Sequence, residues 1–129
     1  MLADTSVWVA HFRYANPVLQ SLVAIDQVLC HPLVVLELAC GTPPAPRERT
    51  IGDLKTLQQA VVATTDETLA LIDRERFHDS GCGATDMALL ASVLLTQDTS
   101  LWTLDKKLGA LAARMGVAFN AGSHRRSTS

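Results

Sequence analysis

Four carboxylates are the side chains of this sequence best placed to do chemistry together. Two of them come at the ends of short predicted strands. Asp4 is the last residue of a strand at 2–4, and Asp105 directly follows a strand at 101–104. In a parallel α/β sheet the working site lies at the carboxyl ends of the strands. The positions of Asp4 and Asp105 therefore favour a common site at that edge.

The other two acids lie in apolar helical segments. Glu37 has only apolar neighbours from Leu33 to Ala39, and Asp86 precedes the apolar run Met87–Ala91. An ionised carboxylate buried among apolar side chains is costly unless it is paired or bound to a metal ion. We therefore expect Glu37 to be buried and to need a partner. Asp86 has a simpler alternative, because an acid at a helix N-terminus contributes about 0.3–1 kcal/mol.

Each acid alone has an ordinary explanation, since Asp4 and Asp105 each precede a predicted helix and carboxylates commonly cap helices. The four together favour a hard cation. Mg²⁺ or Mn²⁺ prefers carboxylate and water oxygens and relieves the repulsion among clustered acids. Open positions on such an ion can bind a phosphate and activate a water, which is metal-assisted hydrolysis of a phosphodiester. Asp98, in a turn before a strand, is left out of this site.

The elements that must position these acids alternate between short strands and helices. Strands are expected at 2–4, 27–30, 61–62, 101–104 and 116–119, and helices at 7–13, 17–24, 32–40, 48–59, 65–78, 86–95 and 105–115. Thr5 or Ser6 is expected to cap the first helix, and Thr85 the helix that carries Asp86. This alternation predicts an α/β fold, with a short central parallel sheet flanked by helices on both faces.

The composition fits one globular domain and excludes several classes of protein. The 129 residues are 48% hydrophobic and 19% charged, which excludes a disordered or collagen-like chain. A net charge of −2 and only 5% aromatic residues argue against a basic nucleic-acid coat or a stacking platform, but not against RNA as a substrate. We expect residues 1–120 to form the domain and residues 121–129 a polar, flexible tail.

Cysteine usage and the N-terminus indicate where the protein acts. The three cysteines have no zinc-knuckle spacing, and free thiols fit a reducing compartment. No basic region precedes an apolar stretch at the N-terminus, and no apolar run is long enough to span a bilayer. We therefore expect a cytoplasmic protein with no membrane association.

The four acids also stand in motifs that resemble those of a known family. The run Asp4-Thr5-Ser6-Val7-Trp8-Val9 resembles the opening of PIN-domain proteins, and especially of VapC-type toxin ribonucleases. The segments around the other three acids, 35–41, 83–92 and 101–108, resemble the later motifs of that family in the same order. The ending at 116–119 also fits, so the resemblance covers residues 1–119.

This resemblance implies a PIN-like three-layer sandwich and a Mg²⁺-dependent endoribonuclease that also accepts Mn²⁺. The acids of the four motifs would be the catalytic and metal-binding residues: Asp4, Glu37, Asp86 and Asp105. The hydroxyl groups of the same motifs would support these acids through hydrogen bonds: Thr5, Ser6 and Thr103.

The resemblance also implies partners. They are an RNA substrate of the transfer RNA or ribosomal RNA loop class, a VapB-type antitoxin that inhibits by covering the acids, and a second copy of the chain in a homodimer. A site rich in acids needs cations around it to admit a polyanion. The basic side chains expected to contact RNA are Arg47, Arg49, Lys55, Lys106 and Lys107.

Two alternatives from other classes stay open. One is a non-catalytic PIN-like interaction module, which would have little reason to bury Glu37. The other is a different acid- and Mg²⁺-dependent α/β phosphoesterase. A phosphatase with Asp-x-Asp after its first strand would need an acid where this chain has Ser6, and a phosphoacceptor domain would need a second acid beside Asp4.

Overall fold

A parallel sheet of very short strands organises the molecule. The computed structural model describes residues 1–122, and within them the strands run in the order β3-β2-β1-β4. These strands are β1 (Leu2–Ala3), β2 (Leu29–Cys30), β3 (Gln58–Gln59) and β4 (Leu101–Trp102). In the central pairings Leu2 of β1 lies opposite both Leu29 and Leu101. The predicted α/β fold with a parallel sheet is confirmed.

Two of the five predicted strands are wrong in detail. The third strand is at 58–59 and not at 61–62, and the helix predicted through residue 59 ends at Thr56. The N–H of Ala60 makes a last sheet hydrogen bond to Cys30, 2.9 Å long, after which Val61 and Val62 are half exposed. The strand expected at 116–119 is reduced to one parallel bridge between Leu101 and Ala118.

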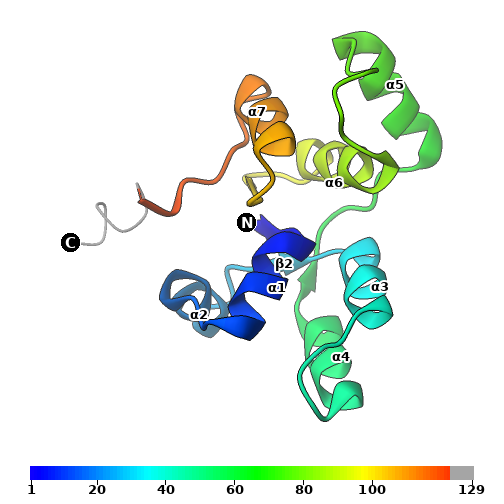
Figure 1. The fold of residues 1–129 in the computed structure, drawn as a ribbon. Coiled ribbons are helices and arrows are strands. Elements are labelled where there is room, and N and C mark those ends of the chain that lie inside the picture. The colour runs from blue at the N-terminus through cyan, green and yellow to red at the C-terminus, as the bar shows by residue number, and fades with distance from the viewer. Residues whose placement is uncertain (123–129) are drawn as a thin grey trace.

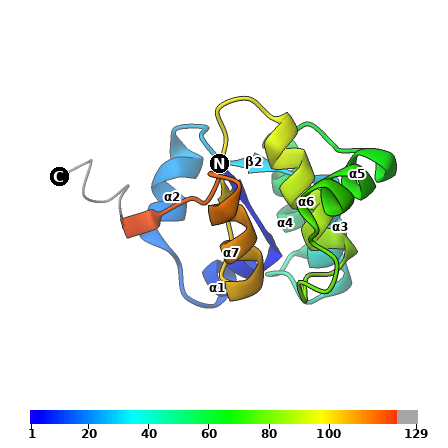
Figure 2. The same ribbon diagram turned by 90° about the horizontal axis from the view of Figure 1, so that it is seen from above.

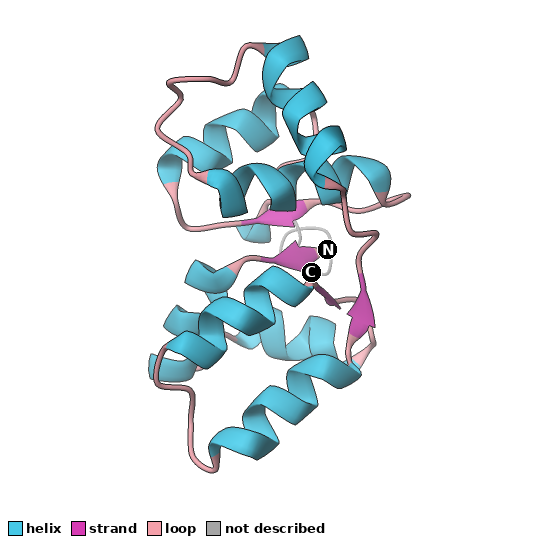
Figure 3. Cartoon of the chain, turned by 90° about the vertical axis from the view of Figure 1, so that its right-hand side faces the viewer, coloured by secondary structure: helices cyan, strands magenta, loops and turns pink. Residues whose placement is uncertain are grey.

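Helices cover both faces of the sheet, as Figures 1 and 3 show, with the strands between two helical layers. One layer holds α1 (Thr5–Arg13), α2 (Pro17–Ala24), α3 (Pro32–Cys40) and α4 (Arg47–Thr56); the other holds α5 (Thr65–Glu75), α6 (Ala84–Leu95) and α7 (Lys106–Arg114). Seen from above in Figure 2, α7 lies near the N-terminal strand, while α5 and α6 lie together to one side. Among the helices of residues 1–122, none combines the length and apolar character needed to cross a membrane.

The helix starts follow local chemistry, but two predicted caps are wrong. Asp4, and neither Thr5 nor Ser6, caps α1 by accepting the N–H of Val7 at 3.2 Å. Thr85 lies inside α6, whose N-cap is Gly83. A carboxylate in the last position before the helix reaches the free N–H groups of the first turn, which the next residue cannot do.

A buried polar cluster joins the two layers behind the sheet. The His31 ring accepts the N–H of Leu33 at Nδ1 and contacts the Ser92 hydroxyl through Nε2, both at 3.0 Å. Ser92 also donates to the carbonyl of Ala88 at 2.7 Å and accepts the N–H of Ala63 at 3.0 Å. Since the Ser92 proton goes to Ala88, His31 must be neutral with its proton on Nε2. The cluster ties the end of β2 to α6 and to the chain before α5.

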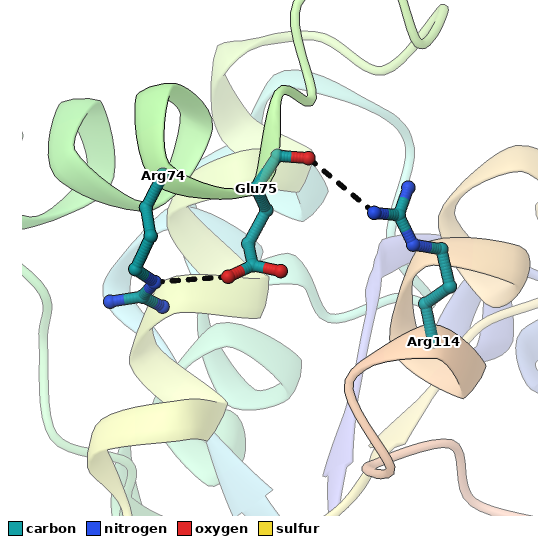
Figure 4. Close-up of polar contacts among 3 residues, drawn as sticks. All are labelled: Arg74, Glu75 and Arg114. Atoms are coloured by element: carbon teal, nitrogen blue, oxygen red, sulfur yellow. Dashed lines mark hydrogen bonds and ion pairs between the residues drawn. The ribbon is translucent and has the colours of Figure 1, made fainter.

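A second junction joins the end of α5 to α7. The Arg114 guanidinium lies over the Phe77 ring, 5.0 Å from its centroid, and contacts the Glu75 carbonyl at 3.5 Å. The Glu75 carboxylate pairs with Arg74 at 3.0 Å (Figure 4). This junction is on the layer opposite α1 and α3. The tail predicted at 121–129 lies, from residue 123 onward, outside the described residues, and its boundary stays a prediction.

Candidate active site

The order of the strands opens a crevice between β1 and β4. The chain leaves β1 through α1 toward β2, whereas β4 lies on the other side of β1 and continues into α7. The connections after these two strands therefore turn to opposite faces of the sheet, which is where α/β folds bind their ligands. Asp4 follows β1 at this point, and Thr103 follows β4.

Asp4 is held rigidly in this crevice. Its side chain is only 5% exposed. Oδ1 accepts the Ser6 hydroxyl at 2.5 Å in addition to the N–H of Val7, and Oδ2 accepts the hydroxyl of Thr103. Three donors thus fix the carboxylate of Asp4 and offset the cost of burying it.

The same two hydroxyls position the loop that carries Asp105. The Ser6 oxygen accepts the N–H of Leu104 at 2.9 Å, and the Thr103 oxygen accepts the N–H of Asp105 at 3.0 Å. Asp105 itself caps α7 by accepting the N–H of Leu108 at Oδ1, 2.9 Å away. The crevice therefore has two carboxylates linked through hydroxyl bridges.

Glu37 lies at the edge of the crevice and is exposed, so the expectation that it is buried is wrong. Helix α3 buries Val34, Val35 and Leu38 and leaves Leu36 59% exposed beside Glu37. The Thr5 hydroxyl donates to Oε1 of Glu37 at 2.6 Å. The run of apolar residues concealed a solvent-facing side of α3, because an exposed leucine is common on protein surfaces.

Asp86 connects the four acids electrostatically. It is partly buried in the first turn of α6. The pKa of Asp86 is raised, first by burial and then by three neighbouring carboxylates, those of Asp105, Asp4 and Glu37. A hydrogen bond from the backbone of Gly83 acts in the opposite direction. The four predicted acids thus come from four separate elements to one place and repel one another there.

The donor set fits a hard divalent cation, although it is not already closed around one. Carboxylate oxygens are the ligands that Mg²⁺ and Mn²⁺ prefer. Within residues 1–122 no three His, Cys, Asp or Glu side chains stand arranged to hold an ion. Asp4 is buried, whereas Glu37 and Asp105 are exposed, and each of the three accepts a hydrogen bond within the protein.

Comparison with known proteins agrees with this geometry. The PIN domain family model matches residues 1–114, which include all four acids. The chain belongs to the PIN-domain family. Two curated relatives, both named Ribonuclease VapC32 and from two strains of Mycobacterium tuberculosis (CDC 1551 / Oshkosh and ATCC 25618 / H37Rv), are each 45% identical to it over 118 residues. The matches cover 92% of this chain and 94% of each relative, and they confirm the predicted resemblance to VapC-type PIN-domain proteins.

The predicted RNA-contacting residues of this PIN domain differ in their distance from the acids. The Lys107 side chain folds over Gly81, so close that a Cβ on that glycine would lie 2.7 Å from its Cδ. Burial raises the pKa of Cys82, Asp86 and Asp105 raise it further, and Lys107 lowers it. Lys107 is therefore close to the acids.

The remaining basic residues are exposed. Arg47 donates to the carbonyl of Ala39 at 3.0 Å, at the C-terminal end of α3. Within residues 1–122 the structure records no hydrogen bond or ion pair from the side chains of Arg49, Lys55 or Lys106.

Sequence reasoning missed a groove of about 470 Å³ that begins at Glu37. Its walls come from α1, through Phe12 and Arg13, and from the chain after α3, through Gly41–Pro44. The nearness of Cys82 to the acids was also missed. The sequence contains no signal for either, because both depend on how α1, α3 and the residues before α6 meet in space.

Proposed function

We propose that this PIN-domain chain is the endoribonuclease toxin of a toxin–antitoxin pair, and that it hydrolyses RNA phosphodiester bonds at the four-acid site. The single observation that carries the proposal is the meeting of Asp4, Glu37, Asp86 and Asp105 at the switch point of the sheet. The 45% identity to proteins named Ribonuclease VapC32 supports the same reaction and substrate class.

Mg²⁺, with Mn²⁺ able to replace it, is the proposed cofactor, since PIN-domain ribonucleases are generally metal-dependent. The residues that would hold it are the four acids. When bound, the ion supplies a Lewis acid for a phosphoryl oxygen and lowers the pKa of a bound water.

The protein's own groups orient this site. The hydroxyls of Ser6 and Thr103 hold Asp4 in one position, and Thr5 holds Glu37. Burial and the neighbouring carboxylates of Asp105, Asp4 and Glu37 raise the pKa of Asp86, and a nearby positive charge would favour its ionised form. Lys107 lies close enough to this cluster to attract the RNA backbone and to offset part of its negative charge.

The proposed protein partner is a VapB-type antitoxin that places a basic side chain among the acids. A second groove of about 410 Å³ between α1, α2 and α4, which includes Trp8, Val23 and Leu54, supports docking of an apolar segment nearby. Within residues 1–122 the Trp8 indole N–H is buried without a hydrogen-bond partner. Inhibition should compete with Mn²⁺, because both occupy the acids. The RNA loop class, the homodimer and the cytoplasmic location stay predictions.

A panel of isosteric variants tests the proposed reaction. Asp4→Asn, Glu37→Gln, Asp86→Asn and Asp105→Asn should each lower the rate of RNA cleavage by orders of magnitude. Asp98→Asn is the matched control, because Asp98 has a positive φ of 53°, which Asn tolerates, and lies outside the site. Full activity in the four variants, or loss of activity in the control alone, would contradict the proposal.

The non-catalytic PIN-like module remains the alternative function. The exposure of Glu37 removes one argument against this module, because an exposed carboxylate needs no partner in order to be tolerated. The module predicts that purified protein binds RNA or protein without cleaving RNA at any Mn²⁺ concentration.

A further inference from the structure

Glu37 belongs both to the acid cluster and to the groove between α1 and the chain after α3. Its carboxylate accepts the hydroxyl of Thr5, the residue next to Asp4, at 2.6 Å, and the same side chain lines the groove. The groove is therefore next to the place where a phosphodiester would be cleaved. Its volume, about 470 Å³, is within the range of about 300–1,000 Å³ typical of small-ligand sites.

The lining of the groove combines an apolar interior with one cation at its rim. Val9, Phe12, Leu38 and Pro43 supply the apolar surface. Arg13, in the last turn of α1, is exposed and is the only cation among the groove's lining residues in the described chain. A flat ring with a phosphate next to it matches this combination, because bases stack on aromatic and apolar surfaces while arginine binds phosphate.

The far wall adds polar groups for recognition. It is formed by Gly41, Thr42 and Pro44, a loop that offers backbone carbonyls and one hydroxyl. Arg47 hydrogen bonds to Ala39 beside this loop and adds positive charge near that wall. An unpaired RNA base that has left the stack exposes its hydrogen-bonding edges, and polar groups of this kind can bind them.

We propose that this groove binds one unpaired RNA base, that of a nucleotide next to the cleaved phosphodiester. Phe12 offers a face for stacking, and Arg13 holds the adjoining phosphate. The inference rests on the proposed function. It adds recognition of a base, which the four acids alone do not contact. Occupation by a segment of a partner protein is the competing outcome.

A double-mutant cycle, with one change in the protein and one in the RNA, tests whether the groove binds a base. The probe is a short single-stranded RNA containing a bond that the wild type cleaves, and matched strands each lack one base on either side of that bond. Binding is measured by fluorescence anisotropy on the Asp86→Asn background, so that the strand stays intact. Loss of the correct base should weaken binding roughly 5–100-fold, as expected for one stacked base.

In Phe12→Leu, the same base loss should cost much less, because the stacking surface for the base is gone. Arg13→Ala should weaken the binding of intact and abasic strands by a similar factor, because Arg13 contacts the phosphate that both strands keep. Phe12→Leu keeps apolar volume, and its melting temperature is checked because the ring packs 6.0 Å from that of Trp8. Arg13→Ala changes an exposed residue and should fold normally. Arg74→Ala is the matched control, an exposed arginine on the opposite helical layer whose ion pair is drawn in Figure 4.

Three results would overturn the inference. If the wild type cleaves RNA but base loss and Phe12→Leu act independently at every position, the base site is wrong and the proposed function stands. If the groove variants leave RNA binding unchanged and only relieve inhibition by a VapB-type partner, the groove binds protein. If no RNA is cleaved, the proposed function and this inference fail together.

Discussion

At the residue scale, the two carboxylate oxygens of Asp4 serve two structural roles. Asp4 caps α1 and, with Thr103 and Ser6, joins the loops after β1 and β4. The capping explanation of this acid is therefore correct, and it is compatible with the proposed chemical role. The cap fixes the carboxylate, and a fixed carboxylate is what a catalytic site requires.

Asp86 is repelled by the other three acids, and this predicts how the stability of the Asp86→Asn variant relative to the wild type depends on pH. Its pKa in the folded protein is raised above the ordinary value of 3.8, so ionisation destabilises the fold. That cost is absent below pH 3.8 and is fully present once the pH exceeds the raised value. In chelator, Asp86→Asn should therefore gain stability over the wild type as the pH rises from about 4 to 7.

Melting curves at several pH values, with and without millimolar Mn²⁺, measure this difference. Saturating Mn²⁺ should stabilise the wild type by offsetting the repulsion and should remove the advantage of the variant. Asp98→Asn should show neither effect. An Asp86→Asn advantage that is constant across pH and unaffected by Mn²⁺ would refute the electrostatic account.

The identity of the acids was accessible from the sequence, but their environment was not. Motif order singled out Asp4, Glu37, Asp86 and Asp105, and the structure brings them together. The reason given for Glu37 was wrong, because the apolar run around it includes exposed Leu36. The sequence shows which residues are next to Glu37 along the chain. Whether Glu37 is buried depends on which face of the helix packs against the rest of the protein.

At the element scale, the helices were predicted more closely than the strands, although β1, β2 and β4 lie within the predicted ranges 2–4, 27–30 and 101–104. The bounds of α2 at 17–24 and α3 at 32–40 agree with the prediction, because proline starts each helix and Gly41 ends the second. Two-residue strands have too little periodicity for their bounds to be predicted, and β3 was placed wrongly. The strand was predicted at the valine pair 61–62, whereas the residues in register with β2 are the glutamines at 58–59, which had been assigned to the preceding helix.

The His31–Ser92 cluster should set the stability of the link between β2 and α6. Ser92→Ala would leave the His31 Nε2–H and the Ala63 N–H without a partner inside the protein, at a cost of about 1–3 kcal/mol. Ser21→Ala, at an exposed hydroxyl on α2, should change the stability by less than about 0.5 kcal/mol. Urea denaturation of both variants compares them. Equal stability in the two variants would show that this cluster is not the link described.

The two lysines that begin α7 should contribute unequally to RNA binding. Both lysines are exposed, but Lys107 lies over Gly81 beside the acids, whereas Lys106 makes no recorded side-chain contact within residues 1–122. Lys107→Ala should lower the dependence of log K on log salt by about 0.7, the value for one phosphate of a single strand. Lys106→Ala should change it less. Equal slopes for the two variants would remove Lys107 from the docking surface.

At the scale of the whole molecule, exposed apolar side chains indicate a partner surface. Val62 and Leu69 are each 51% exposed and border an apolar pocket of about 480 Å³ between α3, α5 and α6. Surfaces of this kind commonly bind another protein. We expect the purified chain to be a dimer of twice its 13.9 kDa mass.

Light scattering on two variants checks this assignment. Leu69→Asp should yield a monomer, because a charge at the centre of an apolar interface costs more than the contact contributes. Ile25→Asp, on the opposite helical layer and 63% exposed, should leave the dimer intact. A wild type that is monomeric at micromolar concentration, or a Leu69→Asp protein that stays dimeric, would move the partner surface elsewhere.

The central claim is that the four acids act as one metal-dependent site for RNA hydrolysis. The most direct measurement is the rate of cleavage of one RNA as a function of Mn²⁺ concentration, for the wild type and for Asp86→Asn, with excess chelator as the starting point. The account predicts no cleavage in chelator, a rate that rises and saturates with Mn²⁺ in the wild type, and a rate lower by orders of magnitude in the variant at every concentration. Cleavage that persists in chelator, or equal rates in the two proteins, would contradict it.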